Sequence, residues 1–230
     1  MTNREIQGYI DLLNKEKESE TIFTRQISET VVVAKVWSEQ PKITDDIIGN
    51  FDSYRFFFLK NETGRYIGAV LDMNYDLHWY MVPENRKLGY LTKALKESIL
   101  PYIFYDGRDK QRINIDKNSI GDKFYQNSMR VAIDAGFKAI NEEETEFELL
   151  QSEFNWDCEN IEELNSGINS ERLEILQKRV FYAYKLLYKT SDELSIKFND
   201  DNGLKNATDE VKKFIWKLEE LKWNFDVSEN

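Results

Sequence analysis

The stretch that most constrains the fold of this chain is residues 77–100, LHWYMVPENRKLGYLTKALKESIL. An alternating apolar run predicts a strand, Pro83 and Gly89 mark a loop, and apolar residues at helical spacing predict a helix directly after it. Such a unit gathers backbone N–H groups and a helix N-terminus at one point, where they can hold an anionic group such as a pyrophosphate. Arg86 and Lys87 add two cations. The sequence therefore predicts a phosphate-binding loop, with an ordinary strand-to-helix connection as the alternative.

At this loop the chain resembles the GNAT superfamily of acyl-CoA-dependent N-acyltransferases. The family signature is Arg or Gln, two residues, Gly, one residue, then Gly or Ala; Arg86 and Gly89 match it, whereas Leu91 replaces the small final residue. The resemblance implies that acetyl-CoA is the cosubstrate and that no metal is needed. The residues that it implies for binding acetyl-CoA are Tyr80, Met81, Val82, Arg86, Lys87, Leu88, Gly89, Tyr90, Leu91, Thr92 and Asn118.

A second partial match lies downstream. GNAT proteins commonly have an Asn after the fifth strand, a small residue three positions later, and Gly-Phe eight residues beyond that. Ser128 stands eight residues before Gly136-Phe137, but Tyr125 occupies the expected place of the Asn. Asn118 follows the strand more closely and is the preferred equivalent, which implies a side-chain hydrogen bond to the pantetheine arm. A turn or N-cap asparagine is the alternative.

The periodicity of the chain predicts an α+β fold. With the resemblance, it gives a mixed, mostly antiparallel, GNAT-like sheet flanked by helices over residues 1–150. The strand predicted at 77–82 is expected to splay from the next strand and to offer its backbone to the pantetheine arm. Helices are predicted at 4–17, after Gly89 as far as Pro101, and before Gly136, which is placed as a left-handed C-cap; strands are predicted at 30–37, 54–59, 65–73, 77–82, 111–115, 137–140 and 145–150.

Residues 151–230 lie outside the resemblance and predict a helical C-terminal extension. One apolar stripe follows helical spacing from Leu173 to Leu187 and another from Val211 to Leu221, with Thr208 as the predicted N-cap of the second helix. These stripes fit either an appendage packed on its own domain or the surface of a homodimer or another partner. The Asp-Asp-Asn-Gly run at 200–203 fails the register of a calcium loop, so it predicts a turn.

Composition narrows the function. The net charge of −11 argues against recognition of a nucleic-acid backbone and suits a cationic amine acceptor, although an acidic surface also serves solubility alone. A single cysteine, Cys158, offers no disulfide framework and no cysteine-based metal site. The sequence shows no leader pattern and no apolar run of about 18 residues, so a cytoplasmic protein without a membrane span is expected.

Acyl transfer to an amine requires a neutral amine, a donor for the developing oxyanion and a proton for the leaving group. A backbone N–H near Met81 or Val82 is the candidate donor. Among the possible bases, which include Asp76 and Glu62, His78 is favoured because its pKa lies closest to neutrality, and Glu84 is a further candidate. A lone strand histidine is, however, more often structural.

The group that protonates the leaving thiolate does not match the family pattern. In many GNAT enzymes a tyrosine before Gly-Phe protonates the leaving thiolate, and the matching position here is Ala132. Tyr125, about two helical turns earlier, or water would have to replace it.

The leading hypothesis is a GNAT-like N-acetyltransferase that passes the acetyl group of acetyl-CoA to a primary amine, which could be a small amine, a protein N-terminus or a lysine. A non-catalytic module on the same fold, sensing acyl-CoA or binding a protein, is the second hypothesis. A third is an unrelated α+β domain, which full pairing of the strand at 77–82 on both edges would indicate.

Overall fold

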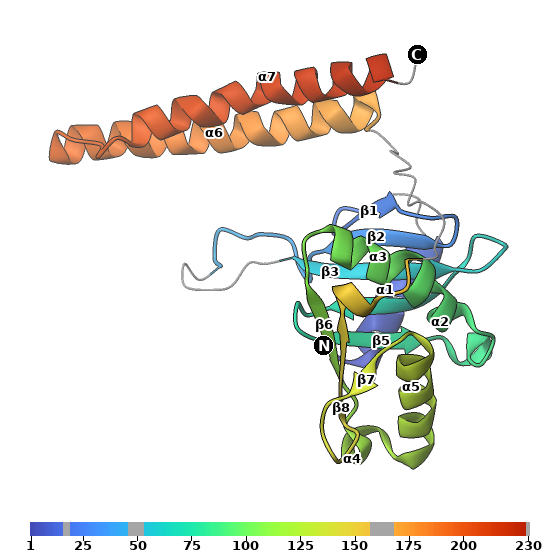
Figure 1. Cartoon of the computed structure of the whole chain (residues 1–230). Coiled ribbons are helices and arrows are strands. Elements are labelled where there is room, and N and C mark those ends of the chain that lie inside the picture. The colour runs from blue at the N-terminus through green and yellow to red at the C-terminus, as the bar shows by residue number, and fades with distance from the viewer. Residues whose placement is uncertain (16–18, 46–52, 157–167, 229–230) are drawn as a thin grey trace. The chain divides into compact units, whose positions relative to one another are not determined.

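The computed structural model describes residues 1–15, 19–45, 53–156 and 168–228 (Figure 1). The chain divides into two compact units, Met1–Asn165 and Ser166–Asn230. The elements of the first unit are α1 (Asn3–Lys15), β1 (Ile22–Gln26), β2 (Val31–Val36), β3 (Tyr54–Lys60), β4 (Tyr66–Asp72), β5 (Leu77–Met81), the 3₁₀ turn η1 (Pro83–Asn85), α2 (Tyr90–Ala94), the π-helical η2 (Leu95–Ile99), α3 (Leu100–Tyr105), β6 (Lys110–Asn114), α4 (Lys117–Ile120), α5 (Asp122–Asp134), β7 (Lys138–Ala139), β8 (Glu146–Leu150) and the 3₁₀ turn η3 (Gln151–Glu153).

Strands β1 to β5 form an antiparallel meander in the order β1-β2-β3-β4-β5. Its middle strands are rich in β-branched and aromatic residues and are buried on both faces, which is why they read as continuous apolar runs. The predicted strands are confirmed here, and β1 is an additional edge strand that the sequence analysis did not anticipate.

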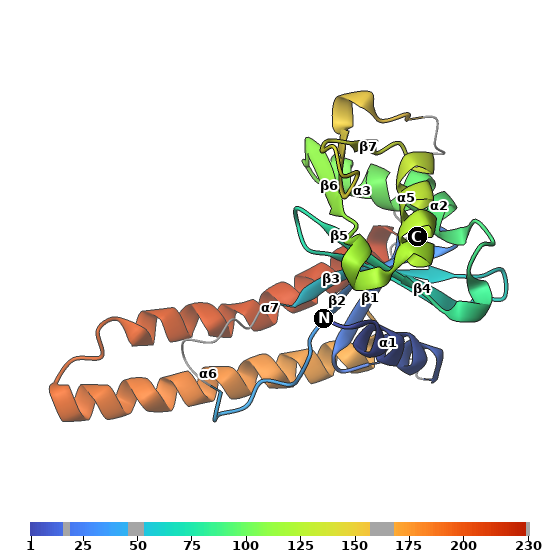
Figure 2. The same cartoon turned by 90° about the horizontal axis from the view of Figure 1, so that it is seen from below.

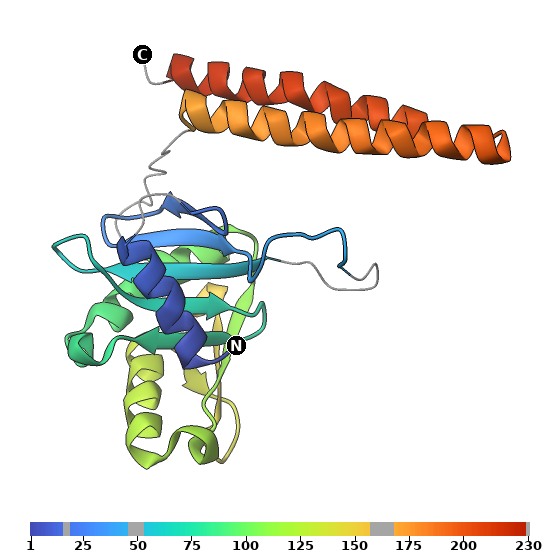
Figure 3. The ribbon, with the colours of Figure 1, turned by 180° about the vertical axis from the view of Figure 1, so that it is seen from behind.

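Helices cover both faces of this meander. On one face α1 inserts Ile6 and Ile10, both fully buried, against a cluster that includes Phe56 and Phe58. Figure 3 shows α1 lying across that face. On the other face, α2, η2 and α3 pack on Phe57 and the strands around it. The sheet, with β5 as one of its edge strands, therefore lies between two layers of helices.

The helix after the loop is longer than predicted. It continues through Pro101 as the run 90–105, because η2 is a π-helical segment placed immediately before α3. Proline has no N–H to donate and its ring crowds the preceding turn. In η2 the backbone bonding widens to i→i+5 just before Pro101, where regular α-helical bonding would be interrupted. The helix therefore does not end at Pro101, although the sequence predicts that it does.

The remaining strands form a separate antiparallel sheet in the order β6-β8-β7. Between β6 and β7, α5 ends in a Schellman motif: Gly136 has φ 99°, its N–H donates to the carbonyl of Ile133 at 2.9 Å, and the N–H of Phe137 donates to that of Ala132 at 3.0 Å. The predicted C-cap at Gly136 is therefore confirmed. All strand pairs described in either sheet are antiparallel, and the α+β fold class with a mostly antiparallel sheet and helical flanks is confirmed.

A buried carboxylate ties the two sheets together near the end of β4. Asp72 has a fully buried side chain; it accepts a bond from Nε of Arg55 at 2.6 Å and two bonds from Nη2 of Arg108 at 2.8 and 3.0 Å. Charge-assisted bonds of this kind are stronger than neutral ones. They fix the turn that leads from α3 into β6.

The second unit is a helical hairpin of α6 (Ser170–Phe198) and α7 (Leu204–Ser228), which run side by side (Figure 2). Thr208 is not an N-cap: it lies inside α7 and its hydroxyl donates to the carbonyl of Leu204 at 2.7 Å. Asp201 takes the expected role instead, because its carboxylate accepts the N–H of Lys205 at 3.0 Å and the hydroxyl of Ser191 at 2.6 Å. The predicted turn between the helices is confirmed.

The boundary between the two units lies further along the chain than residue 150. Phe154 is buried in the first unit, where its ring centroid lies 5.4 Å from that of Phe104. Within the described parts of the chain, no helix is both long enough and apolar enough to cross a bilayer.

Candidate functional site

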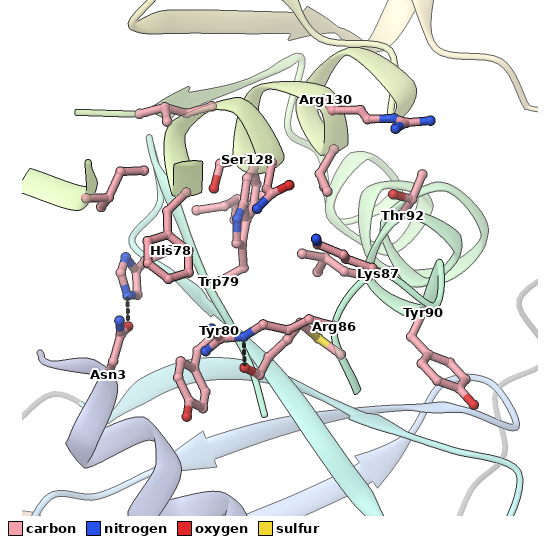
Figure 4. Close-up of a pocket in the computed structure, with 18 of the residues that line it drawn as sticks. Asn3, His78, Trp79, Tyr80, Arg86, Lys87, Tyr90, Thr92, Ser128 and Arg130 are labelled. Carbon is pink, nitrogen blue, oxygen red and sulfur yellow. Dashed lines mark hydrogen bonds between the residues drawn. The ribbon is translucent and has the colours of Figure 1, made fainter. Parts of the chain in front are cut away.

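A cavity of about 1060 Å³ opens along the free edge of β5 (Figure 4). Its walls come from β5, the loop after it, the start of α2, the end of β6 and one face of α5. The lining residues are Asn3, Leu77, His78, Trp79, Tyr80, Met81, Pro83, Asn85, Arg86, Lys87, Gly89, Tyr90, Leu91, Thr92, Asn114, Ile115, Asp116, Ile120, Lys123, Phe124, Asn127, Ser128, Arg130, Val131 and Asp134.

The edge of β5 on this cavity has no partner strand among the described residues, because β6 belongs to the other sheet. The N–H of Val82 donates to the carbonyl of Ile67 at 2.9 Å, and the carbonyl of Asp76 accepts the N–H of Met73, just after β4, at 2.9 Å. In an antiparallel ladder these bonds alternate along the strand. Even-numbered residues therefore bond to β4, and Trp79 and Met81 direct their N–H and C=O groups to the open edge.

This alternation distinguishes the two candidate oxyanion donors. The N–H of Val82 is already used in the ladder, and Val82 does not line the cavity. Met81 remains, with its N–H on the open side. Its carbonyl oxygen accepts a bond from Nε of Arg86 at 2.8 Å, which joins the strand to the loop that follows.

Residues 86–92 form the loop that the sequence predicts to bind phosphate, and it is called the phosphate loop below. Its backbone resembles that of an anion-binding turn. Lys87 has φ 64° and Gly89 φ 83°, so two residues of positive φ precede the helical run. A Cβ on Gly89 would meet nothing within 4 Å, so glycine is favoured here by its backbone angle and not by crowding. No side chain caps the start of α2. The first-turn N–H groups, which lack intrahelical partners, are thus left for a ligand.

The residue that departs from the GNAT signature is accommodated by the core. Leu91 is only 8% exposed and belongs to the main hydrophobic cluster, so its side chain packs in the core and does not occupy the space enclosed by the loop. Tyr90 turns the other way and donates from its hydroxyl to Glu62 at 2.6 Å, a bond that raises the pKa of Tyr90. Leu88, at 61% exposure, does not line the cavity.

Cations outnumber acids on the cavity wall, although the chain carries a net charge of −11. The acids are Asp116 and Asp134, and the cations are Arg86, Lys87, Lys123 and Arg130. The Arg86 guanidinium lies 5.7 Å from the ring centroids of both Tyr80 and Phe124, so it spans from β5 to α5. The wall therefore suits a ligand with several negative charges.

His78 lines the cavity from β5. Its Nε2 lies 3.0 Å from Oδ1 of Asn3 on α1. Partial burial lowers the pKa of His78 below its usual 6.5; the N-terminal ammonium acts in the same direction and Asp76 opposes it. The imidazole is therefore neutral near pH 7, as a proton acceptor must be.

The other two predicted catalytic residues, Glu84 and Tyr125, and the predicted binding residue Asn118 do not line the cavity. Glu84 is exposed in η1 and is not part of the cavity wall. Tyr125 is buried, with 5% exposure, and its hydroxyl donates to the carbonyl of Glu144 at 2.9 Å. Asn118 is exposed and does not line the cavity; its N–H donates to Oδ1 of Asp116 in the turn that starts α4. The geometry moves all three out of the site.

Several polar or aromatic residues on the wall are not among the ligand contacts predicted from the sequence, including the following four. Trp79 faces the cavity from β5, Asn114 ends β6, and Asn127 and Ser128 lie on α5. The spacing of Ser128 to Gly136-Phe137 was a usable signal, and Asn127 stands directly beside it. The described residues contain no group of three or more His, Cys, Asp or Glu that could hold a metal ion.

No protein-family model and no curated protein matches this sequence. Among solved structures, mutant forms of the spermidine/spermine N-acetyltransferase SpeG from Vibrio cholerae are similar at 15% identity and a TM-score of 0.39, over 67% of this chain and 93% of that one. A further mutant of the same Vibrio cholerae enzyme gives 15% identity and a TM-score of 0.36, over 67% and 94%. Similarity at this level carries no conclusion about what the present chain does.

Proposed function

We propose that this chain is an N-acetyltransferase of the GNAT type, which transfers the acetyl group of acetyl-CoA to a primary amine. The observation that carries the proposal is the open edge of β5 running directly into the phosphate loop. One strand thus offers unpaired backbone groups to an extended amide-bearing arm, and the loop beside it offers N–H groups and cations to phosphates.

Acetyl-CoA, when bound, supplies an acetyl group as a thioester that a neutral amine can attack. The phosphate loop, with Arg86 and Lys87, holds the pyrophosphate. The N–H of Met81 stabilises the negative charge that develops on the carbonyl oxygen. His78 accepts the proton that the amine loses. The acceptor is a small amine, a protein N-terminus or a lysine, and the acidic surface of the chain favours a cationic one.

A non-catalytic acyl-CoA-binding module is the second candidate, and one observation favours it. The position of the usual acid is Ala132, which is fully buried, and Tyr125 is held in the core by Glu144. The cavity wall therefore holds no tyrosine at the place where GNAT enzymes commonly have one. Water would have to protonate the leaving group if transfer occurs.

Calorimetric titration with acetyl-CoA tests the binding site. Gly89→Val places a β-branched side chain at φ 83° in the phosphate loop, and Gly107→Val introduces the same strain at φ 92° in a turn outside the cavity. We expect micromolar binding by the wild type and by Gly107→Val, and at least a tenfold loss in Gly89→Val. Equal loss in both variants would assign the effect to backbone strain, and no binding by the folded wild type would reject the proposal.

Transfer is measured separately, by the release of free thiol with a panel of polyamines, lysine peptides and peptides with free N-termini. Turnover with one class identifies the acceptor. Binding without turnover on any of them would favour the non-catalytic module.

A further inference from the structure

The start of α1 is fixed by the first residues of the chain. Thr2 and Glu5 form a capping box: the N–H of Thr2 donates to Oε2 of Glu5 at 2.6 Å, and the N–H of Glu5 donates to Oγ1 of Thr2 at 3.3 Å. The hydroxyl of Thr2 also donates to Glu5 at 2.9 Å. Asn3 is therefore held as the first residue of the helix, with a defined direction for its side chain.

Two side chains of α1 meet two side chains of β5. Asn3 and Gln7 are four residues apart on the helix, a rise of about 6 Å. His78 and Tyr80 are two residues apart on the strand, a rise of about 6.6 Å, and point to the same face. Because these spacings agree, both bonds form at once: Nε2 of His78 to Oδ1 of Asn3 at 3.0 Å, and the hydroxyl of Tyr80 to Oε1 of Gln7 at 2.7 Å.

The contact of His78 with Asn3 indicates which nitrogen of His78 carries the proton. A neutral imidazole has one N–H donor and one acceptor nitrogen. The oxygen Oδ1 of Asn3 can only accept, so Nε2 is the protonated nitrogen and the lone pair resides on Nδ1. No partner of Nδ1 is found in the described parts of the chain. The charged groups that act on the ring are the Asp76 carboxylate and the N-terminal ammonium.

The carboxylate of Asp76 does not compete for this role. Its Oδ1 accepts the N–H groups of Leu77 and Asn114 at 2.8 and 3.0 Å, and its Oδ2 accepts from the side chain of Asn114 at 3.2 Å. It is held by the ends of β5 and β6, so it biases the ring by charge alone.

We propose that Asn3 is the positioning residue of His78: it holds the imidazole as the Nε2–H tautomer and so makes Nδ1 the atom that accepts the amine's proton. This inference rests on the proposed function, because it deepens the role of His78 in that reaction. The first turn of α1 is thereby a part of the site, although it lies 75 residues from His78 in sequence.

The tautomer can be measured without any activity, because His78 is the only histidine of the chain. In the full-length protein labelled with ¹⁵N-histidine, long-range ¹H–¹⁵N spectra above pH 7.5 distinguish the two ring nitrogens. We expect the wild type to show a protonated Nε2. Asn3→Ala should lose this preference, so that both ring nitrogens move toward averaged shifts.

Asn14→Ala is the matched control. Asn14 also lies on α1 and bonds to the strand layer, through the backbone of Tyr66 at 2.9 Å in both directions, but it does not touch His78. Its spectrum should match that of the wild type. A wild type protonated at Nδ1, or an Asn3→Ala spectrum with unchanged ring shifts, would overturn the proposal.

The kinetic arm separates this inference from the proposed function. Once an acceptor is known, Asn3→Ala should lower kcat about tenfold with the KM for acetyl-CoA unchanged. Asn3→Asp can still accept from Nε2, so it should restore kcat. Its added negative charge should move the acidic limb of the pH profile to higher pH. A tautomer that follows Asn3 while kcat does not would contradict the catalytic role. Absence of turnover in the wild type would reject the proposed function while the spectra still report on Asn3.

Discussion

Arg86 donates from Nε to the carbonyl oxygen of Met81 at 2.8 Å, and its guanidinium lies against the rings of Tyr80 and Phe124. The residue therefore joins three parts of the cavity wall: the open edge of β5, the phosphate loop and α5. Because this hydrogen bond and these ring contacts hold its side chain, Arg86 is positioned in the cavity without a ligand.

Arg86→Ala should weaken acetyl-CoA binding about tenfold, or about 1.4 kcal/mol. The variant loses a cation beside the phosphates and the bond that orders the end of β5. Lys96→Ala is the control, since Lys96 is exposed on η2 and does not line the cavity. Titration at low and high salt should show the difference shrinking with ionic strength. Tighter binding by Arg86→Ala would mean instead that Arg86 occupies the place of the ligand.

Tyr125→Phe should lower the free energy of unfolding by about 1 kcal/mol, because it removes the bond from a buried hydroxyl to the carbonyl of Glu144. Acetyl-CoA binding should not change, since Tyr125 does not line the cavity. Urea unfolding measures the first effect and calorimetry the second. Loss of transfer with unaltered stability would return Tyr125 to the candidate acids.

Much of the fold could be predicted from the sequence because local patterns and tertiary packing agree there. The strands of the meander are dense in β-branched and aromatic residues, and the left-handed cap at Gly136 follows from its place after an apolar helical stripe. At Pro101 and Thr208 the local pattern and the structure disagree. Each residue type usually marks a helix boundary, but here a π-helical segment accommodates the proline and Asp201 has already capped α7.

The site was only partly predictable, because several of its residues are brought together by tertiary packing between segments that are distant in sequence. The phosphate loop is local, so its residues could be located from strand, glycine and helix signals. Asn118, by contrast, was chosen by its nearness in sequence to β6, but α4 turns it away and places Asn127 and Ser128 of α5 on the wall. The contact of Asn3 with His78 joins the first helix to the fifth strand, and no spacing rule in a single sequence reports such a pair.

Gly68 should be essential for the edge strand. A Cβ at this position would overlap the sulfur of Met81 and lie 3.0 Å from the carbonyl oxygen of Tyr80. Because the second neighbour is backbone, Gly68→Ala should displace β5 and cost about 1–3 kcal/mol of stability, with weaker acetyl-CoA binding. Gly8→Ala is the matched control: Gly8 lies inside α1 with nothing within 4 Å of its Cβ position, so this substitution should stabilise the chain by up to about 1 kcal/mol. Thermal unfolding of both variants gives the comparison, and a neutral Gly68→Ala would show that β5 can shift freely.

The lowered pKa of His78 predicts how stability depends on pH. Burial disfavours the charged imidazole, so the folded chain binds the proton less readily than the unfolded chain, whose histidine pKa is about 6.5. The contribution of the neutral ring is therefore fully present above about pH 6.5 and is lost as the pH falls toward the lower pKa of the folded state. Urea unfolding of the wild type and of His78→Gln between pH 5 and 8 isolates this effect, because the shared carboxylates cancel in the difference. The wild type should lose stability relative to the variant on acidification; a relative gain would mean that Asp76 outweighs burial and that His78 is protonated in the fold.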